Sequence, residues 1–247
     1  MKIIRVSNTT LYLLFILFLC GYIRVGITIF LIVLIHEVGH VLVCLIFGYK
    51  IKSVTLYPFG GITRVEKDIN TSPYKELILA SAGLFMQIIL YVVALSFGYK
   101  DLLFYKYNKS IFLFNLLPII PLDGSVIVYS LLNRFTTFKN SYKVYIVVSI
   151  ISLVIYIIIN YKYSLNNYLI VSIFIYKIYE GIKNYKYVYN RFLVERYLKK
   201  YHFKYISTRE GNLDILKIDT YQYFKNGGKI TSEREKLAEM FDKTQSF

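Results

Sequence analysis

The chain has 247 residues, of which 56% are apolar, and a formal net charge of +15 at pH 7. With a positive mean hydropathy, this composition is too apolar for an ordinary soluble domain of that length. No zinc-finger spacing, recognition-helix pattern or aromatic ribonucleoprotein motif accompanies the basic excess, so no nucleic-acid partner is predicted. The composition therefore indicates a membrane protein.

Six apolar runs approach the length of a membrane-spanning helix, which needs about 20 residues. In chain order they cover residues 11–23, 25–47, 77–97, 111–132, 144–159 and 168–182. The corner from Gly21 to Arg24 separates the first two runs and predicts a tight helical hairpin. The expected fold is an all-α membrane protein with about six transmembrane helices, a short β-like loop after the second, and a small C-terminal tail. Residues 1–182 would form the transmembrane core, and residues 183–247 a basic tail made of an amphipathic linker and a small appendage.

The distribution of Lys and Arg predicts the orientation, because these residues are retained on the cytoplasmic side of a membrane. With six spans and a cytoplasmic amino terminus, the cytoplasmic segments carry more Lys and Arg than the opposite ones. The basic tail adds to the same face, so both termini are expected in the cytoplasm. A basic, tyrosine-rich tail also suits contact with the anionic leaflet of the lipid bilayer.

The sharpest motif is His36-Glu37-Val38-Gly39-His40, inside the second apolar run. Residues four apart share one helix face, so both imidazoles can reach a single zinc ion, which binds nitrogen at about 2.0–2.1 Å. Glu37 would stand beside the metal as the general base for the hydrolytic water. Charged groups in a span cost at least about 2.5–3.5 kcal/mol on insertion scales and are retained mainly for function. One catalytic zinc per chain is therefore predicted, in preference to histidines that only hydrogen-bond neighbouring helices.

A third ligand is expected at Asp123, because a catalytic zinc takes three protein ligands and keeps one position for water. Asp123 is the acid found by scanning the other spans, and it follows a run that Pro118 and Pro121 interrupt. Irregular backbone at membrane depth is tolerated only where it is buried in protein or lines a wet cavity. The alternative is that Asp123 caps a helix restarting after Pro121; the ligand role is preferred because the scan offers no other acid.

Asn115, Cys44 and His202 are three further polar residues that could belong to the site. Asn115, in the interrupted run, would donate hydrogen bonds to the substrate or hold the broken helix together. Cys44 lies four residues after His40, but a cysteine in an apolar span usually behaves as a small hydrophobe. His202, in the polar tail, is expected at the surface.

The segment from Tyr57 to Val65 pairs glycines with a partly alternating, β-branched stretch. As an edge strand, with Phe59, Gly60 and Gly61 at its start, it would bind an extended substrate through main-chain hydrogen bonds. A plain interfacial turn is the equally weighted alternative.

The motifs Leu34 to His40, Pro58 to Gly61, Ala82-Gly83, Asn115 to Pro118 and Pro121 to Gly124 together resemble the site-two protease family of intramembrane metalloproteases. The likeness covers about residues 25–135. It is closest to the branch of spore-forming bacteria that cleaves the pro-sequence from the precursor of sigma factor K, and residues 190–197 share it.

The resemblance implies the same ligands, His36, His40 and Asp123, with Glu37 as base and Asn115 facing the substrate. It also implies a membrane-associated protein substrate of the pro-sigma factor K type, membrane inhibitor proteins, and a place in the mother-cell membrane around the forespore. A homo-oligomer is compatible with the sequence.

Some features depart from the family pattern. Leu84 replaces a proline that commonly follows Ala-Gly, and Ser125 replaces a second glycine after Asp-Gly. Residues 201–247 are too few for a full nucleotide-sensing cystathionine-β-synthase domain, so nucleotide control is not predicted. Two other functions compete: a catalytically inactive membrane scaffold or regulator, and a metalloprotease for soluble substrates, whose usual glutamate ligand would have to be Glu180 or Glu195.

Overall fold

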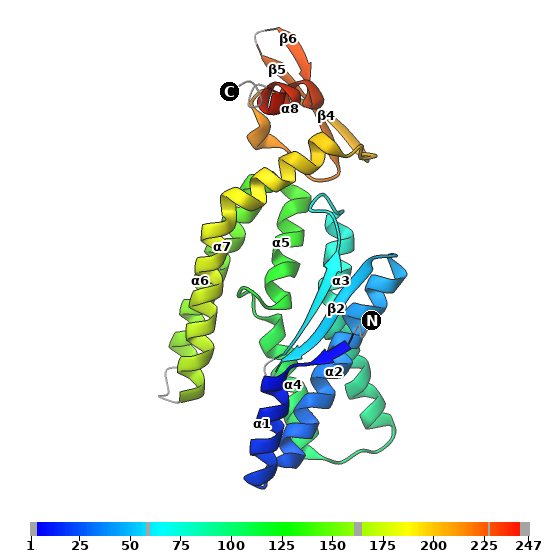
Figure 1. The fold of residues 1–247 in the computed structure, drawn as a ribbon, viewed down its shortest axis with the longest axis vertical. Helices are drawn as coiled ribbons and strands as arrows, with labels where there is room; N and C mark the ends of the chain where they lie inside the picture. Colours follow the sequence, from blue (N-terminus) through cyan, green and yellow to red (C-terminus); the bar gives the residue numbers. More distant parts are fainter. Residues whose placement is uncertain (1–3, 58–59, 161–164, 227, 243–247) are drawn as a thin grey trace. The chain divides into compact units, whose positions relative to one another are not determined.

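The computed structural model describes residues 4–57, 60–160, 165–226 and 228–242 (Figure 1). This part of the chain is mostly helical and also contains two three-stranded sheets. It divides into two compact units. The first comprises residues up to 67 with 78–117 and 122–124, and the second comprises residues 68–77, 118–121 and everything from 125 onward. The domain boundary expected after residue 182 falls inside a long helix and stays a prediction.

The first unit begins with the expected helical hairpin. Helix α1 (Asn8–Leu19) and helix α2 (Ile23–Ile46) pack against each other. Gly21 between them has a φ of 77°, a backbone conformation that costs glycine little and most other residues more. Within α2, a Cβ at Gly26 would lie 2.9 Å from a methyl carbon of Leu17, so a small residue there lets the two helices approach.

The loop after α2 is a β-hairpin, which resolves the choice between strand and turn in favour of the strand. Strand β2 (Lys50–Tyr57) pairs antiparallel with β3 (Gly60–Glu66), and β1 (Ile4–Val6) adds in parallel to the other edge of β2. Val54 and Leu56 are buried on one face of β2, and this sheet packs against α2 (Figure 1). The all-α expectation was wrong in this respect, because the hairpin and β1 form a three-stranded sheet. The sequence indicated the hairpin but gave no signal for β1.

The apolar run expected at 111–132 is two helices. Helix α4 (Leu102–Leu116) ends before Pro118, and helix α5 (Asp123–Phe135) begins after Pro121. Proline lacks the backbone donor that a helix needs and disfavours helical geometry in the residue before it. The start of α4 also lies earlier than the apolar run, because the side chain of Asp101 accepts a hydrogen bond from the backbone N–H of Leu103 and caps the helix.

Three helices of the described residues are long and apolar enough to cross a membrane: α2, α3 (Pro73–Ser96) and α6 (Phe138–Ile159). Many of their large apolar side chains are exposed, including Leu45, Phe85 and Ile159. Such exposure would be unfavourable in water and suits a lipid environment. The other expected spans coincide with the shorter α1, the broken α4 and α5, and α7 (Leu165–Leu198), so a total of six stays a prediction.

The second unit joins α6 and α7, which run side by side, to a folded carboxyl-terminal part (Figure 1). Helix α7 continues through the expected linker to Leu198. The tail then forms β4 (Tyr205–Arg209), a short 3-10 helix (Leu213–Ile215), β5 (Thr220–Asn226), β6 (Lys229–Ser232) and α8 (Glu233–Asp242). The sheet order is β4-β5-β6, with β4 and β5 parallel.

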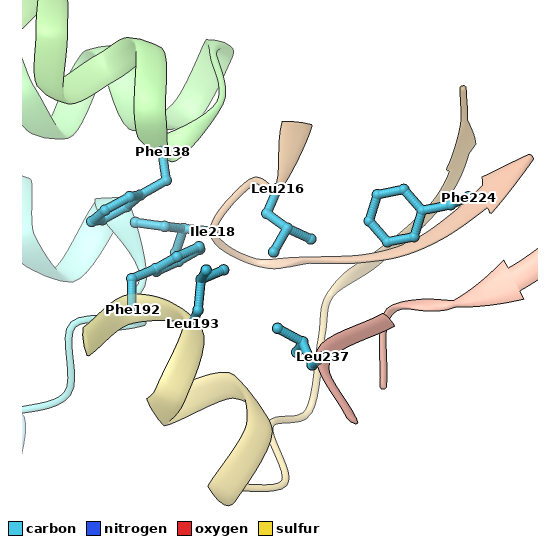
Figure 2. Packing of buried hydrophobic residues seen from close by; sticks show 7 residues of the cluster. All are labelled: Phe138, Phe192, Leu193, Leu216, Ile218, Phe224 and Leu237. Atoms are coloured by element: carbon cyan, nitrogen blue, oxygen red, sulfur yellow. The ribbon is translucent and has the colours of Figure 1, made fainter. Parts of the chain in front are cut away.

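A buried apolar cluster fixes this tail to the ends of α6 and α7. Figure 2 shows the seven side chains that form it. They are Phe138, Phe192, Leu193, Leu216, Ile218, Phe224 and Leu237. The rings of Phe138 on α6 and Phe192 on α7 stack with their centroids 4.0 Å apart. The appendage is therefore an ordered part of the second unit and shares a core with its helices.

Candidate metal centre

Two histidines and an aspartate converge inside the first unit. His36 and His40 lie one turn apart on α2, and their Nε2 atoms are 3.1 Å from each other. Oδ2 of Asp123, the first residue of α5, lies 2.9 Å from Nε2 of His36 and 3.4 Å from Nε2 of His40. His36 is buried and the other two residues are partly buried. The structure thus brings together the three side chains that the sequence singled out.

Close backbone packing places these side chains. A Cβ at Gly39 would lie 2.5 Å from the carbonyl oxygen of Ala82, so the glycine lets α3 approach the face of α2 that carries the histidines. A Cβ at Gly124 would lie 2.1 Å from the carbonyl oxygen of Leu116, so the first turn of α5 packs against the last turn of α4. Because α4 ends at Leu116, a new helix can begin at Asp123 and place its carboxylate beside the two histidines.

The far sides of both imidazoles are held by α3. Nδ1 of His40 donates to the carbonyl oxygen of Leu79 at 2.8 Å, and Nδ1 of His36 donates to Oε1 of Gln87 at 3.1 Å. A carbonyl oxygen can only accept, so Nδ1 carries the proton in each ring. In a neutral imidazole with this tautomer Nε2 carries the lone pair, and the two Nε2 atoms lie next to each other and to the Asp123 carboxylate.

Such a group of lone pairs fits a cation. Oδ2 of Asp123 is buried and has no hydrogen-bond partner among the described residues, although two ring nitrogens lie close to it. Tetrahedral zinc with bonds of about 2.0–2.1 Å separates its ligand atoms by roughly 3.3 Å, and the three observed separations lie between 2.9 and 3.4 Å. Two imidazoles and one carboxylate are also a donor set that zinc accepts. The residues present therefore fit a zinc ion.

Glu37 lies beside this group and is also buried, with 6% of its surface exposed. Its Oε2 accepts a hydrogen bond of 2.9 Å from the hydroxyl of Thr63 on β3. A Cβ at Gly61 would lie 2.2 Å from the carboxyl carbon of Glu37, so only glycine leaves room for the carboxylate there. The hairpin after α2 thus packs directly on the acid next to the candidate ligands.

The remaining residues predicted for the site differ in their placement. Gly60 and Gly61 lie at the start of β3, whereas Phe59 lies outside the described residues. Asn115 is half-buried in the last turn of α4, and no hydrogen bond joins its side chain to the ligand group within the described part of the chain. Cys44 is fully buried outside that group, and His202 is exposed.

Sequence reasoning missed the side chains that support the site. Gln87 and Thr63 were not singled out, and Gly83 appeared only as part of a motif. A Cβ at Gly83 would lie 2.5 Å from Nε2 of both His36 and His40, so the absence of a side chain there keeps the space beside the ligands open. A lone glutamine inside the apolar α3 was a usable signal, since polar residues at this depth are usually retained for function.

Comparisons with known proteins identify the family of the chain. The sequence profile of Peptidase family M50 matches residues 24–102. Stage IV sporulation protein FB of Bacillus subtilis is 30% identical over 192 residues, which cover 74% of this chain and 67% of that protein. A zinc metalloprotease of Methanocaldococcus jannaschii is 30% identical over 125 residues, 48% of this chain but only 37% of that protein.

A solved structure supports the fold. The site-2 protease from Methanocaldococcus jannaschii superposes with a TM-score of 0.50 at 21% identity, covering 82% of this chain and 96% of that one. The fold and the site define a membrane metalloprotease. The chain belongs to Peptidase family M50, the site-2 protease family.

Proposed function

We propose that the chain is an intramembrane zinc metalloendopeptidase in which His36, His40 and Asp123 hold one zinc ion and Glu37 is the general base. The observation that carries this proposal is the convergence of two imidazole Nε2 atoms and one carboxylate oxygen within 4.8 Å of one another, next to a buried glutamate. A scaffold without activity has no need for this arrangement at membrane depth, where polar groups are costly.

The chain's own residues supply most of the reaction. A bound zinc polarises the scissile carbonyl and lowers the pKa of water to about 7. The carboxylate of Glu37 takes a proton from the water as its oxygen attacks the carbonyl carbon. Glu37 then returns that proton to the nitrogen of the leaving amine, so the glutamate ends the cycle ionised again. The acceptors Leu79 and Gln87 hold the Nδ1 atoms of His40 and His36, so in each ring Nε2 is the nitrogen that would bind the ion.

The edge of β3 is the proposed substrate-binding element. In the described residues β3 pairs with β2 along one side only, and it lies against the helix that carries Glu37. An extended substrate segment can add to this edge through main-chain hydrogen bonds, which also exposes the peptide bond that a helix would hide. Gly60 and Gly61 let that backbone approach closely, and Phe59 and Asn115 are proposed to contact the substrate.

The proposed substrate is a membrane-associated precursor of the sigma factor K type, processed near the cytoplasmic face during sporulation. Similarity to stage IV sporulation protein FB over two thirds of that protein supports this choice. Both termini would lie in the cytoplasm, in the mother-cell membrane around the forespore, with membrane inhibitor proteins controlling the activity. The excess of Lys and Arg in the segments assigned to the cytoplasm supports this orientation.

Co-expression with a precursor of sigma factor K tests the proposal. Wild-type protein should shorten the precursor, while Glu37→Gln should keep its zinc and lose cleavage by about 100-fold or more, because general base catalysis contributes about 10²–10⁴-fold. Full activity of Glu37→Gln would refute the mechanism. A wild-type protein that cuts another tethered precursor but leaves this one intact would refute only the choice of substrate.

A further inference from the structure

The side chain of Thr63 on β3 reaches the proposed general base. Its hydroxyl donates to Oε2 of Glu37 at 2.9 Å. Thr63 pairs across the hairpin with Val54, and Gly61 pairs with Leu56. Val54 and Leu56 are both buried. Because alternate residues of a strand share a face, Gly61 and Thr63 lie together on the face of the sheet that covers Glu37.

These two residues act on different parts of the carboxylate. Thr63 occupies Oε2, whereas a Cβ at Gly61 would come within 2.6 Å of Oε1. Among the described residues no side chain is hydrogen-bonded to Oε1. One oxygen is therefore held by a hydrogen bond from the strand, while the backbone of Gly61 packs on the carboxyl group without placing a hydrogen-bonding side chain on the other oxygen.

We propose that Thr63 is a positioning residue for proton transfer: it fixes Oε2 of Glu37 so that Oε1 is the atom that takes the proton from water and returns it to the leaving amine. The inference rests on the proposed function, because it assigns a role within the same reaction. Glu37 sits on α2 and Thr63 on the strand proposed to bind substrate. The base is consequently aligned by the element that carries the peptide bond to it.

A purely structural role for the Thr63 hydroxyl is less consistent with its surroundings. Threonine and valine are both β-branched and both favour strands, so the strand itself does not require the hydroxyl. Its described hydrogen bond goes to Glu37 and to no backbone group of the hairpin. Thr55 offers a matched control, because it lies in the middle of the same hairpin between Val54 and Leu56 and therefore on the opposite face of the sheet.

The test measures kcat, KM and zinc content for wild type, Thr63→Val, Thr63→Ala, Thr63→Ser and Thr55→Val. All are purified full-length in detergent, with a precursor of sigma factor K as the probe. Both variants without a hydroxyl should lower kcat by about tenfold or more, part of the 10²–10⁴-fold contribution of a general base. Their KM and zinc content should stay within about twofold of wild type. Thr63→Ser should restore kcat to within about threefold, and Thr55→Val should match wild type.

Several results would overturn the inference. Equal kcat values for Thr63→Val and Thr55→Val would remove any role of the hydroxyl while leaving the proposed function intact. Loss of zinc together with activity in both hydroxyl-free variants, or no recovery in Thr63→Ser, would assign Thr63 a structural role instead. If wild type and Thr55→Val both fail to cleave in a zinc-dependent way, the proposed function itself fails, and the role of Thr63 with it.

Discussion

Oε1 of Gln87 on α3 accepts a hydrogen bond from Nδ1 of His36 at 3.1 Å. The side chain of Gln87 has no exposed surface. The contact fixes the ring tautomer and turns Nε2 toward His40 and Asp123. Partners of this kind orient metal-binding histidines and raise their basicity. The glutamine in the apolar helix α3 thus orients the imidazole of His36.

Replacing this acceptor should weaken zinc binding. Gln87→Leu is expected to lower zinc affinity by about 10–100-fold, the usual effect of losing such a partner. The fold should survive, because Nε2 of Gln87 has no hydrogen-bond partner among the described residues and leucine leaves no new buried polar group on its own side chain. Gln87→Glu keeps an acceptor and serves as the control. Titration against a competing chelator measures the effect, and equal affinities for wild type and Gln87→Leu would contradict it.

A methyl group at position 83 should block the centre without unfolding the helix. In Gly83→Ala the new Cβ would lie 2.5 Å from Nε2 of both histidines, in the space next to the candidate ion. Alanine also favours helix over glycine by about 1 kcal/mol, so helix α3 itself should not be weakened. We expect zinc content and cleavage to fall together by about tenfold or more. The new methyl group would push the imidazoles of His36 and His40 away from the positions in which they can bind the ion.

The matched control for this change is Phe85→Leu, two residues along α3 on a side chain that is 65% exposed. It should keep both zinc and activity. A Gly83→Ala protein with full zinc content and wild-type cleavage would show that the histidines do not bind their ion on the side facing α3.

The carboxyl-terminal part should depend on one buried ion pair. Nε of Arg196 on α7 lies 3.0 Å from Oε1 of Glu233 on α8, and the two side chains are 0% and 2% exposed. Burial raises the pKa of Glu233 and lowers the pKa of Arg196, so each charge is costly without the other. Removing one partner of such a pair costs about 3–5 kcal/mol.

We therefore expect Arg196→Met to expose the segment after α7 to limited proteolysis of the full chain in detergent. Lys177→Met removes one partner of an exposed pair with Glu180 and should change proteolysis little, since exposed pairs contribute about 0–1 kcal/mol. Arg196→Met combined with Glu233→Leu should recover part of the lost resistance. Equal resistance of Arg196→Met and Lys177→Met would show that the pair does not hold the appendage in place.

The helices and the candidate ligands could be predicted because single residues carry strong signals. An apolar run of sufficient length is expected to be helical in lipid, because a helix satisfies its own backbone hydrogen bonds. Histidine, glutamate and aspartate inside such runs stand out because inserting them into a membrane costs free energy. The sequence also marked the break at Pro118 and Pro121. These features can be recognised from a short stretch of sequence, or from residue types that are rare in apolar helices.

The parts that could not be predicted depend on contacts between distant segments. Strand β1 is only three residues long and pairs with residues 54–56, so no periodicity marks it. The hydrogen bond from Thr63 to Glu37 joins positions 26 apart, and threonine is common in any strand. The tail forms five short elements, and its buried core includes Phe138 and Phe192 of the preceding helices, which lie far away in the sequence.

The most direct test is zinc affinity, measured by chelator competition for wild type and Asp123→Ala. Wild type should bind one zinc ion per chain. Asp123→Ala should bind it more weakly by more than the roughly 10–100-fold that follows loss of an outer partner, because a ligand itself is removed. An Asp123→Ala protein that binds zinc as tightly as wild type would contradict the assignment of His36, His40 and Asp123 as one metal centre.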